Sequence, residues 1–492
     1  MSIVAVIGAG IGGLSTAIRA AAEGRKVTLL ESSPEVGGKL RQLKIGAYRF
    51  DLGPSLFTWP ELLEDTLKAA GEHAAPFHYT KLDRSCHYFW PDGTRFKAWS
   101  DRDKLSAEIQ SAFGIDPVPV LNHLDSSQRG FNATKGLFLE QSLHEASSWK
   151  PNSTLGHLGK AVKSWRDLPL TRKLNAWNRR VGHPQLQQLF NRYATYNGSD
   201  PYRAPAMLHV IPHLEFGMGT FAPQSGMHGI VEALHQTALN LGVNIRTDAR
   251  VEKINVEKGA VNGVTLLGGE FIEADVVVSG ADVTPTYRNM LSDQKQPERI
   301  LSAEPSTSGV IFYWGMRHPA PDLHLHNILW AEDYREEFAA LFERQEISED
   351  PTVYINIGSQ TSPDDAPEGA GNWFVMLNAP AGWDPKGLDD LRRKVEQKIE
   401  RMTGINVREH RECEHVLTPN DIELRTGSHR GALYGPASNA PLSAFLRHRN
   451  RDRKIKGLYF AGGSVHPGGG IPLCLLSGRI THQLMEKHDP LL

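Results

Sequence analysis

The sequence predicts an α/β protein in which a parallel sheet is packed between other elements. Residues 4–31 have the pattern strand, glycine turn, helix, strand, and residues 458–484 have the pattern strand, glycine turn, helix. A third segment, 273–279, contains an apolar run and is followed by the small residues Gly280 and Ala281. This pattern is typical of a buried strand. Short apolar strands that alternate with helices indicate a parallel sheet covered on both faces.

The first stretch has the spacing of a dinucleotide-binding turn. Gly8, Gly10 and Gly13 follow the apolar strand Val4–Ile7 in the order G-x-G-x-x-G, and the next strand ends at Glu31. In such a unit the glycines permit a tight turn and a close approach of backbone to a pyrophosphate, whose charge the helix N-terminus favours. An acid at the end of the second strand accepts bonds from an adenosine ribose, so NAD or FAD is favoured over NADP.

The residues that follow favour FAD. Gly37 and Gly38 again bring backbone close to a ligand, and Lys39 adds a cation, although a solvated loop lysine is the alternative. With "DLGPS" at 51–55, these segments resemble the flavin amine oxidase and carotenoid desaturase superfamily, which binds FAD with such a fingerprint followed by GG(R/K). The resemblance implies a Rossmann-like FAD-binding domain of that type with an interleaved α+β substrate domain.

The resemblance also implies roles for individual residues. Glu31 would hold the ribose, Lys39 would contact the phosphates or the flavin, and the backbone of Val251 would hold the adenine, while Ser55 and Leu56 would line the isoalloxazine. No metal ligand is expected. The residues expected to bind the cofactor are Gly8, Gly10, Gly12, Gly13, Glu31, Gly38, Lys39, Ser55, Leu56, Val251, Asp282, Gly462, Gly463, Gly470, Ile471 and Pro472.

The second glycine stretch is expected to hold the other end of the same cofactor. Its strand, Leu458–Ala461, and its helix, Leu475–Leu484, are separated by a turn rich in glycine and proline. A helix N-terminus fed by glycines can place its dipole against the electron-rich end of a reduced flavin. His466, in the same turn, could be a base or a structural histidine.

The elements between the two stretches follow from periodicity and turn residues. We expect helices at 60–75, 101–114 (capped by Ser100 or Asp101), 229–241 and 389–402, a hairpin at 85–99, a helical, aromatic region at 125–205, and antiparallel strands at 308–315, 352–358 and 372–378. The predicted FAD-binding domain comprises 1–75, 215–290 and 445–492, and the substrate domain comprises 76–214 and 291–444.

Composition limits the partners. Of the 492 residues 40% are hydrophobic and 22% charged, with a net charge of −2, so a packed core is expected and nucleic acid is not an expected partner. Three scattered cysteines without metal-ligand spacing fit a reducing compartment. No signal peptide or membrane-spanning run is expected. We predict a cytoplasmic protein, peripherally associated with the inner membrane through the aromatic region, including Trp165 and Trp177.

Two segments narrow the resemblance and the expected reaction. "GGSVHPGGGIPLCLLSGR" near the C-terminus and "YATYNGSDPYRAPAM" at 193–207 resemble the bacterial-type carotenoid (phytoene) desaturases, and the first is most similar to the hydroxycarotenoid, hydroxyneurosporene-type desaturases. This resemblance implies an FAD-dependent enzyme that introduces a conjugated double bond at the 3,4 position of a 1-hydroxylated carotenoid. The alternatives are a phytoene desaturase, a flavin amine oxidase and a non-catalytic GDI-like binding protein.

The catalytic base and the electron acceptor, oxygen or a quinone, stay open at this point. Glu140, Glu145 and Glu215 are candidate bases by residue type alone, and ordinary ion-paired or exposed carboxylates are the alternative. The expected partners are a hydrophobic carotenoid and a membrane lipid surface. A tunnel that takes up a hydroxylated polyene must supply a hydrogen-bond partner for the hydroxyl group.

Overall fold

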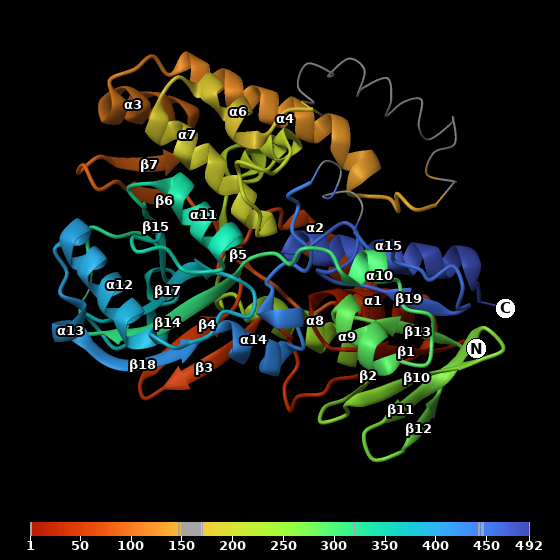
Figure 1. The fold of residues 1–492 in the computed structure, drawn as a ribbon. Coiled ribbons are helices and arrows are strands. Elements are labelled where there is room, and N and C mark those ends of the chain that lie inside the picture. The colour runs from red at the N-terminus through yellow and green to blue at the C-terminus, as the bar shows by residue number, and fades with distance from the viewer. Residues whose placement is uncertain are drawn as a thin grey trace.

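A computed structural model describes residues 2–145, 148, 169, 171–318, 320–440, 443 and 447–491. A five-stranded parallel sheet organises one half of the molecule (Figure 1), with the strand order β19-β13-β1-β2-β9. Its strands are β1 (Ile3–Ile7), β2 (Lys26–Leu30), β9 (Asn244–Arg246), β13 (Val276–Ser279) and β19 (Leu458–Phe460). The parallel arrangement predicted for the two glycine stretches and the third apolar run is therefore confirmed.

Alternation along β1 explains how both faces of this sheet are covered. Val4 and Val6 point into a core formed with the helices α1 (Ile11–Ala22), α8 (Gly229–Asn240) and α15 (Ile471–His488). Ala5 and Ile7 point to the opposite face, as the period of two requires, and pack with a three-stranded sheet. That sheet consists of β10 (Val251–Glu257), β11 (Ala260–Leu266) and β12 (Phe271–Glu273).

A seven-stranded sheet organises the other half (Figure 1), with the order β18-β14-β17-β16-β15-β6-β7. All of its pairs are antiparallel except β15 with β6, so the predicted hairpin and antiparallel strands are confirmed. Helix α12 (Leu388–Thr403) packs against it through Leu391, Val395 and Ile399. The strands are β6 (Arg84–Phe89), β7 (Arg95–Trp99), β14 (Ser308–Met316), β15 (His326–Leu329), β16 (Val353–Ile357), β17 (Gly371–Ala379) and β18 (Arg411–Leu417).

The remaining helices and two two-stranded sheets complete the described fold. Asp101, rather than Ser100, caps α3 by accepting a bond of 2.9 Å from the backbone nitrogen of Lys104. The helices are α2 (Glu61–Lys68), α3 (Arg102–Phe113), α4 (Val118–Phe138), α6 (Leu174–Asn178), α7 (Pro184–Asn191), α9 (Val283–Pro285), α10 (Glu298–Leu301), α11 (Tyr334–Ala339), α13 (Val407–His410) and α14 (Pro419–Thr426), and the two-stranded sheets pair β3 (Arg41–Ile45) with β4 (Tyr48–Leu52) and β5 (Tyr79–Lys81) with β8 (Phe221–Pro223).

Each sheet collects strands from distant parts of the chain. The parallel sheet takes its strands from 3–30, 244–279 and 458–460, and the seven-stranded sheet takes them from 84–99 and 308–417. The division into two discontinuous domains with the boundaries given above stays a prediction.

The helical, aromatic region supplies core rather than surface where the structure describes it. Trp177 is only 7% exposed, and the guanidinium carbon of Arg180 lies 4.0 Å from its ring centroid. Phe131, Phe190 and Tyr193 are also buried. Trp165 lies outside the described residues. Among the helices that the structure describes, none is long and apolar enough to cross a bilayer.

Candidate functional site

A cavity of about 1300 Å³ lies between the two halves and is lined by residues from both. This volume exceeds the roughly 300–1000 Å³ typical of a pocket for one small ligand. All the residues predicted to bind the cofactor line it, with the exception of Gly13. The cavity therefore has room for a dinucleotide and a second, apolar molecule.

Gly13 has a packing role behind the cavity wall. A Cβ on Gly13 would lie 2.0 Å from the carbonyl oxygen of Gly8, so only glycine lets α1 start this close to β1. Gly10 differs, because a Cβ added to it would have no atom closer than the Cα of Gly38, at 4.0 Å. Gly10 also lines the cavity. Gly10 also precedes α1 without a side-chain cap. The first N–H groups of α1 are thus available to an anion at the cavity wall.

Glu31 follows β2 at the same wall and is held in place by backbone. It is 5% exposed, and its Oε2 accepts a bond of 2.8 Å from the nitrogen of Ala9, while Oε1 accepts one of 3.0 Å from the nitrogen of Ser33. A carboxylate has about four acceptor sites, so some remain for a ribose hydroxyl. The uncapped helix and the fixed acid together fit the phosphate and ribose of a bound dinucleotide.

The second glycine stretch contacts the first one directly. A Cβ on Gly12 would lie 2.8 Å from both the Cα and the nitrogen of Gly462, and a Cβ on Gly478 would lie 2.7 Å from the Cβ of Ser15. Helices α1 and α15 therefore pack through glycines. Gly470 precedes α15, and an added Cβ would meet nothing within 4 Å on its cavity side. The N-termini of both helices consequently open into one cavity.

Lys39 connects the part of the cavity lined by Gly8, Gly10, Gly12, Glu31 and Gly462, here called the cofactor wall, to a segment far along the chain. Its Nζ donates bonds of 3.1 and 2.8 Å to the carbonyl oxygens of Ala432 and Leu433. Burial lowers the pKa of this ammonium group. These contacts disagree with a solvated loop lysine and place a cation at the wall.

The other predicted cofactor residues have identifiable local roles. Ser55 Oγ lies 2.8 Å from Tyr354 Oη, which joins the wall to β16. Asp282 caps α9 by accepting a bond of 3.0 Å from the nitrogen of Thr284. Val251 begins β10 and pairs with Leu266.

Comparison with known proteins decides the family. A family described as "Flavin containing amine oxidoreductase" matches residues 11–483. The chain belongs to this family. It is therefore an FAD-dependent oxidoreductase, and the geometry above fits its cofactor: two uncapped helix N-termini, a fixed acid and a lysine converge on one cavity.

Relatives match this flavoenzyme from end to end. It is 45% identical over 486 residues to a 1-hydroxycarotenoid 3,4-desaturase of Flavobacterium sp. (strain P99-3), with 98% of each chain covered. It is 32% identical to a 4,4'-diapolycopene oxygenase of Methylomonas sp., with 97% of each covered. A solved oxidoreductase from Methanosarcina mazei superposes with a TM-score of 0.63 at 16% identity, covering 98% of this chain and 100% of the other, which indicates a shared fold.

Among the candidate bases, the structure distinguishes Glu215 from the others. Glu215 lines the cavity of the flavoenzyme, whereas Glu140 and Glu145 do not. Glu145 instead forms an ion pair with Lys487 at 3.0 Å and a hydrogen bond with His488 at 3.1 Å. Glu215 would have to act from within a buried ion pair.

His466 has the contacts of a structural histidine. It is 1% exposed, its Nε2 lies 2.8 Å from the carbonyl oxygen of Gln141, and it does not line the cavity. Burial lowers the pKa of His466 to about 4, so it is neutral at physiological pH.

The ion pair of Glu215 involves a residue that the sequence did not single out. Arg192 Nη2 donates to the two carboxylate oxygens of Glu215 at 3.2 and 3.1 Å, and Tyr193 Oη donates to Oε2 at 2.8 Å. Arg192 directly precedes the segment 193–207, but nothing in the spacing of the two residues predicts their pairing. Arg192 and Glu215 therefore form a charged pair in the cavity wall.

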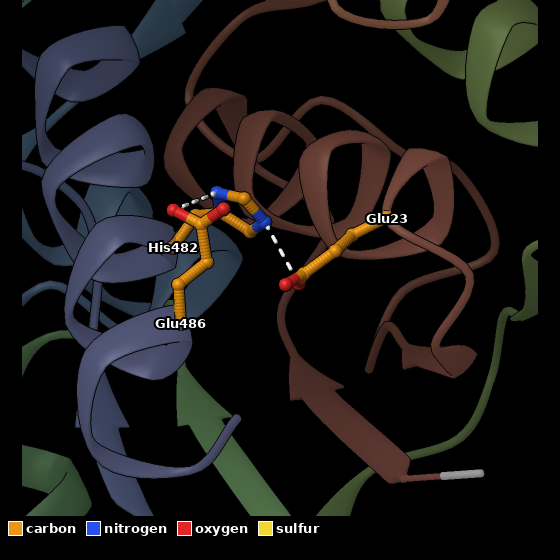
Figure 2. A group of neighbouring side chains, drawn as sticks. All are labelled: Glu23, His482 and Glu486. Atoms are coloured by element: carbon orange, nitrogen blue, oxygen red, sulfur yellow. Dashed lines mark hydrogen bonds and ion pairs between the residues drawn. The ribbon is translucent and has the colours of Figure 1, made fainter. Parts of the chain in front are cut away.

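One group of described side chains has the chemistry of metal ligands, and Figure 2 shows it. His482 of α15 lies between two carboxylates, with Nε2 3.2 Å from Glu23 and Nδ1 3.7 Å from Glu486. Arg25 Nε donates to the same Glu23 oxygen at 2.8 Å. Because a guanidinium already occupies that oxygen, we interpret the group as a network of polar contacts that joins α15 to the end of α1.

Proposed function

We propose that the protein is a carotenoid desaturase that forms a conjugated double bond at the 3,4 position of a 1-hydroxylated carotenoid. The observation that carries this proposal is the 45% identity, over 98% of both chains, to the 1-hydroxycarotenoid 3,4-desaturase of Flavobacterium. The cavity supports this proposal, because its lining extends from the cofactor wall to a set of apolar side chains.

The apolar wall is suited to a long polyene. Its side chains come from α4, from the segment around 207–214 and from the seven-stranded sheet. These residues would hold the polyene across the cofactor and exclude water, which aligns the reacting carbons. Bound FAD would supply a hydride acceptor for an allylic carbon. The apolar residues are Phe131, Phe138, Met207, Leu208, Ile211, Leu214, Ile311, Ile328, Phe374, Met376 and Leu377.

A second reaction on the same class of substrate has support from several relatives, which are carotenoid oxygenases. The 32% identity to a 4,4'-diapolycopene oxygenase favours oxygenation of a carotenoid as the alternative. The two reactions differ in atoms, because desaturation removes two hydrogens and oxygenation adds oxygen. A mass measurement of the product therefore separates them.

The test uses purified flavoprotein and liposomes that contain either a 1-hydroxylated acyclic carotenoid or phytoene, with air or a quinone as the acceptor. We expect the hydroxylated carotenoid to be preferred, with a product that is lighter by two hydrogens and absorbs at longer wavelength. Conversion of phytoene alone would make the enzyme a phytoene desaturase, and a product with added oxygen would make it an oxygenase.

We also propose that the carotenoid reaches the cavity from a lipid surface to which the protein binds peripherally. The support is chemical, since an apolar polyene is dissolved in bilayers. Sedimentation of the same liposomes should carry the protein with them. Trp177 is a poor probe of that contact, because it is buried.

A further inference from the structure

The pair of Arg192 and Glu215 is unusual for a wall that is otherwise largely apolar. The side chains are 13% and 2% exposed, and they lie in two short helices, η5 (Arg192–Asn197) and η7 (His213–Met218). A buried ion pair is often no more stabilising than apolar residues of similar volume, because both charges lose their hydration. Stability alone therefore gives a weak reason for this pair.

Tyrosine side chains hold Arg192 and Glu215 in place. Tyr193 Oη donates to Glu215, and Arg192 Nη2 donates to Tyr88 Oη at 2.9 Å. The ring centroids of Tyr88, Tyr193 and Tyr196 lie 5.6, 4.8 and 5.4 Å from the guanidinium carbon. With these contacts the guanidinium has little freedom to turn, so its orientation toward the cavity is set before any ligand binds.

The pair retains unused hydrogen-bonding capacity. Arg192 has five N–H donors, yet Nη1 makes only a long contact of 3.4 Å to Tyr196 Oη, and Nε is buried with no partner among the described residues. Among the residues that the structure describes, Arg192 is the one donor to Glu215 Oε1. A donor and an acceptor thus lie side by side in the wall of the cavity.

A hydroxyl group needs this combination. It has one hydrogen to donate and two lone pairs that accept, whereas a carbonyl only accepts and a methyl group does neither. Resting on the proposed function, we propose that Arg192 and Glu215 bind the hydroxyl group of the carotenoid, with Arg192 donating to its oxygen and Glu215 accepting its hydrogen. The pair is then the specificity determinant that separates hydroxylated polyenes from hydrocarbons.

The location fits a 3,4 reaction. The hydroxyl-bearing carbon 1 is two bonds from carbon 3, so its oxygen must lie within about 4–5 Å of the reacting bond. Ser55, predicted to line the flavin, bonds to Tyr354, and Tyr354 Oη lies 2.8 Å from His326 Nδ1. Arg192, Glu215, Tyr354 and His326 all line the same cavity as Ser55.

The decisive variant replaces both charges by apolar residues of similar volume. In Arg192→Met/Glu215→Leu no charge remains unpaired, so the protein should fold and keep its FAD absorbance. We expect the dissociation constant for a 1-hydroxylated carotenoid to rise about 10- to 100-fold, because a buried hydroxyl loses its partners. Binding of the matching hydrocarbon should be unchanged or tighter. Quenching of tryptophan fluorescence by the polyene measures both constants without turnover.

A matched control removes an ion pair elsewhere, between the buried Glu396 and the partly exposed Arg411. Glu396 Oε1 and Arg411 Nη1 are 2.7 Å apart and lie outside the cavity lining. Glu396→Leu/Arg411→Met should leave both dissociation constants as in the wild type. If the first double variant does not fold, Tyr193→Phe removes one bond to Glu215 and should weaken binding of the hydroxylated carotenoid alone, by about threefold.

The outcomes separate this inference from the proposed function. If the wild type converts neither carotenoid, the desaturase proposal fails whatever the variants do. If the wild type converts the hydroxylated carotenoid but the double variant binds both compounds as the wild type does, the recognition site is elsewhere. A loss of kcat for both compounds with unchanged binding would also overturn the inference, because the pair would then act in turnover.

Discussion

The two walls of the cavity are built in different ways. The wall that carries the predicted cofactor residues is largely backbone: Gly8, Gly10, Gly12 and Gly462 line it, and α1 and α15 meet through glycines. The substrate wall is built from side chains of the seven-stranded sheet and of short helices. A wall of backbone needs fixed spacings along the chain, whereas a wall of side chains needs only that distant residues meet. The first wall is therefore readable from sequence, and the second is not.

The largest effect should come from breaking the glycine contact. In Gly12→Ala the Cβ would lie 2.8 Å from backbone atoms of Gly462, which cannot rotate away. We expect a loss of about 3 kcal/mol or more in the free energy of unfolding, with no FAD retained. Urea unfolding of the apoprotein and the flavin absorbance of the purified protein measure the two effects.

Gly10→Ala is the matched control. Gly10 has φ −75°, and an added Cβ would have no neighbour closer than 4.0 Å, so the apoprotein should unfold as the wild type does. FAD binding should still weaken, because the methyl group narrows the approach to the α1 N-terminus. Equal stability of the two alanine variants would contradict a backbone-built cofactor wall.

A pH change should affect the substrate half, which contains buried titratable side chains. Glu337 of α11 is 1% exposed, accepts a bond of 2.6 Å from Thr352 Oγ1, and has its pKa raised by burial to about 7. The folded state therefore binds the proton more tightly than the unfolded state, whose pKa is about 4.3. This contribution is present below about pH 4 and is lost as the pH rises to about 7, a change of roughly 3 kcal/mol.

Urea unfolding from pH 4.5 to 8 measures this effect. Glu337→Gln keeps the shape of the side chain and removes its titratable carboxyl group. The free energy of unfolding of the wild type minus that of the variant should therefore decrease as the pH rises. Parallel curves for the two proteins would mean that Glu337 is not protonated in the folded state at neutral pH.

The smallest effect concerns the contact between the two walls. Tyr354→Phe removes the bonds of Tyr354 Oη to Ser55 and His326. We expect a loss of about 1 kcal/mol in the free energy of unfolding and unchanged FAD content, since the cofactor wall itself is intact. Tyr48→Phe, which removes a bond of 2.6 Å to Glu412 at the surface, is a control that leaves the cavity unchanged. Loss of FAD in Tyr354→Phe would show that the two walls are not independent.

Sequence reasoning succeeded where local rules apply. The hairpin β6–β7, the cap at Asp101 and the strand-turn-helix at the N-terminus depend on neighbours in the chain, and the structure confirms them. It was least informative where the outcome depends on burial. Trp177 was a predicted lipid contact, yet the structure buries it against Arg180.

By itself, the sequence determined the parallel sheet and predicted residues that line the cavity, because glycine spacing and apolar periodicity act within a few residues. Only the tertiary structure decided that Gly12 meets Gly462, that Glu215 pairs with Arg192, and that His466 bonds to the Gln141 carbonyl group. The physical reason is that a side chain's chemistry depends on the charges and donors around it. Those neighbours come from other segments and are brought there by the packing of the two sheets.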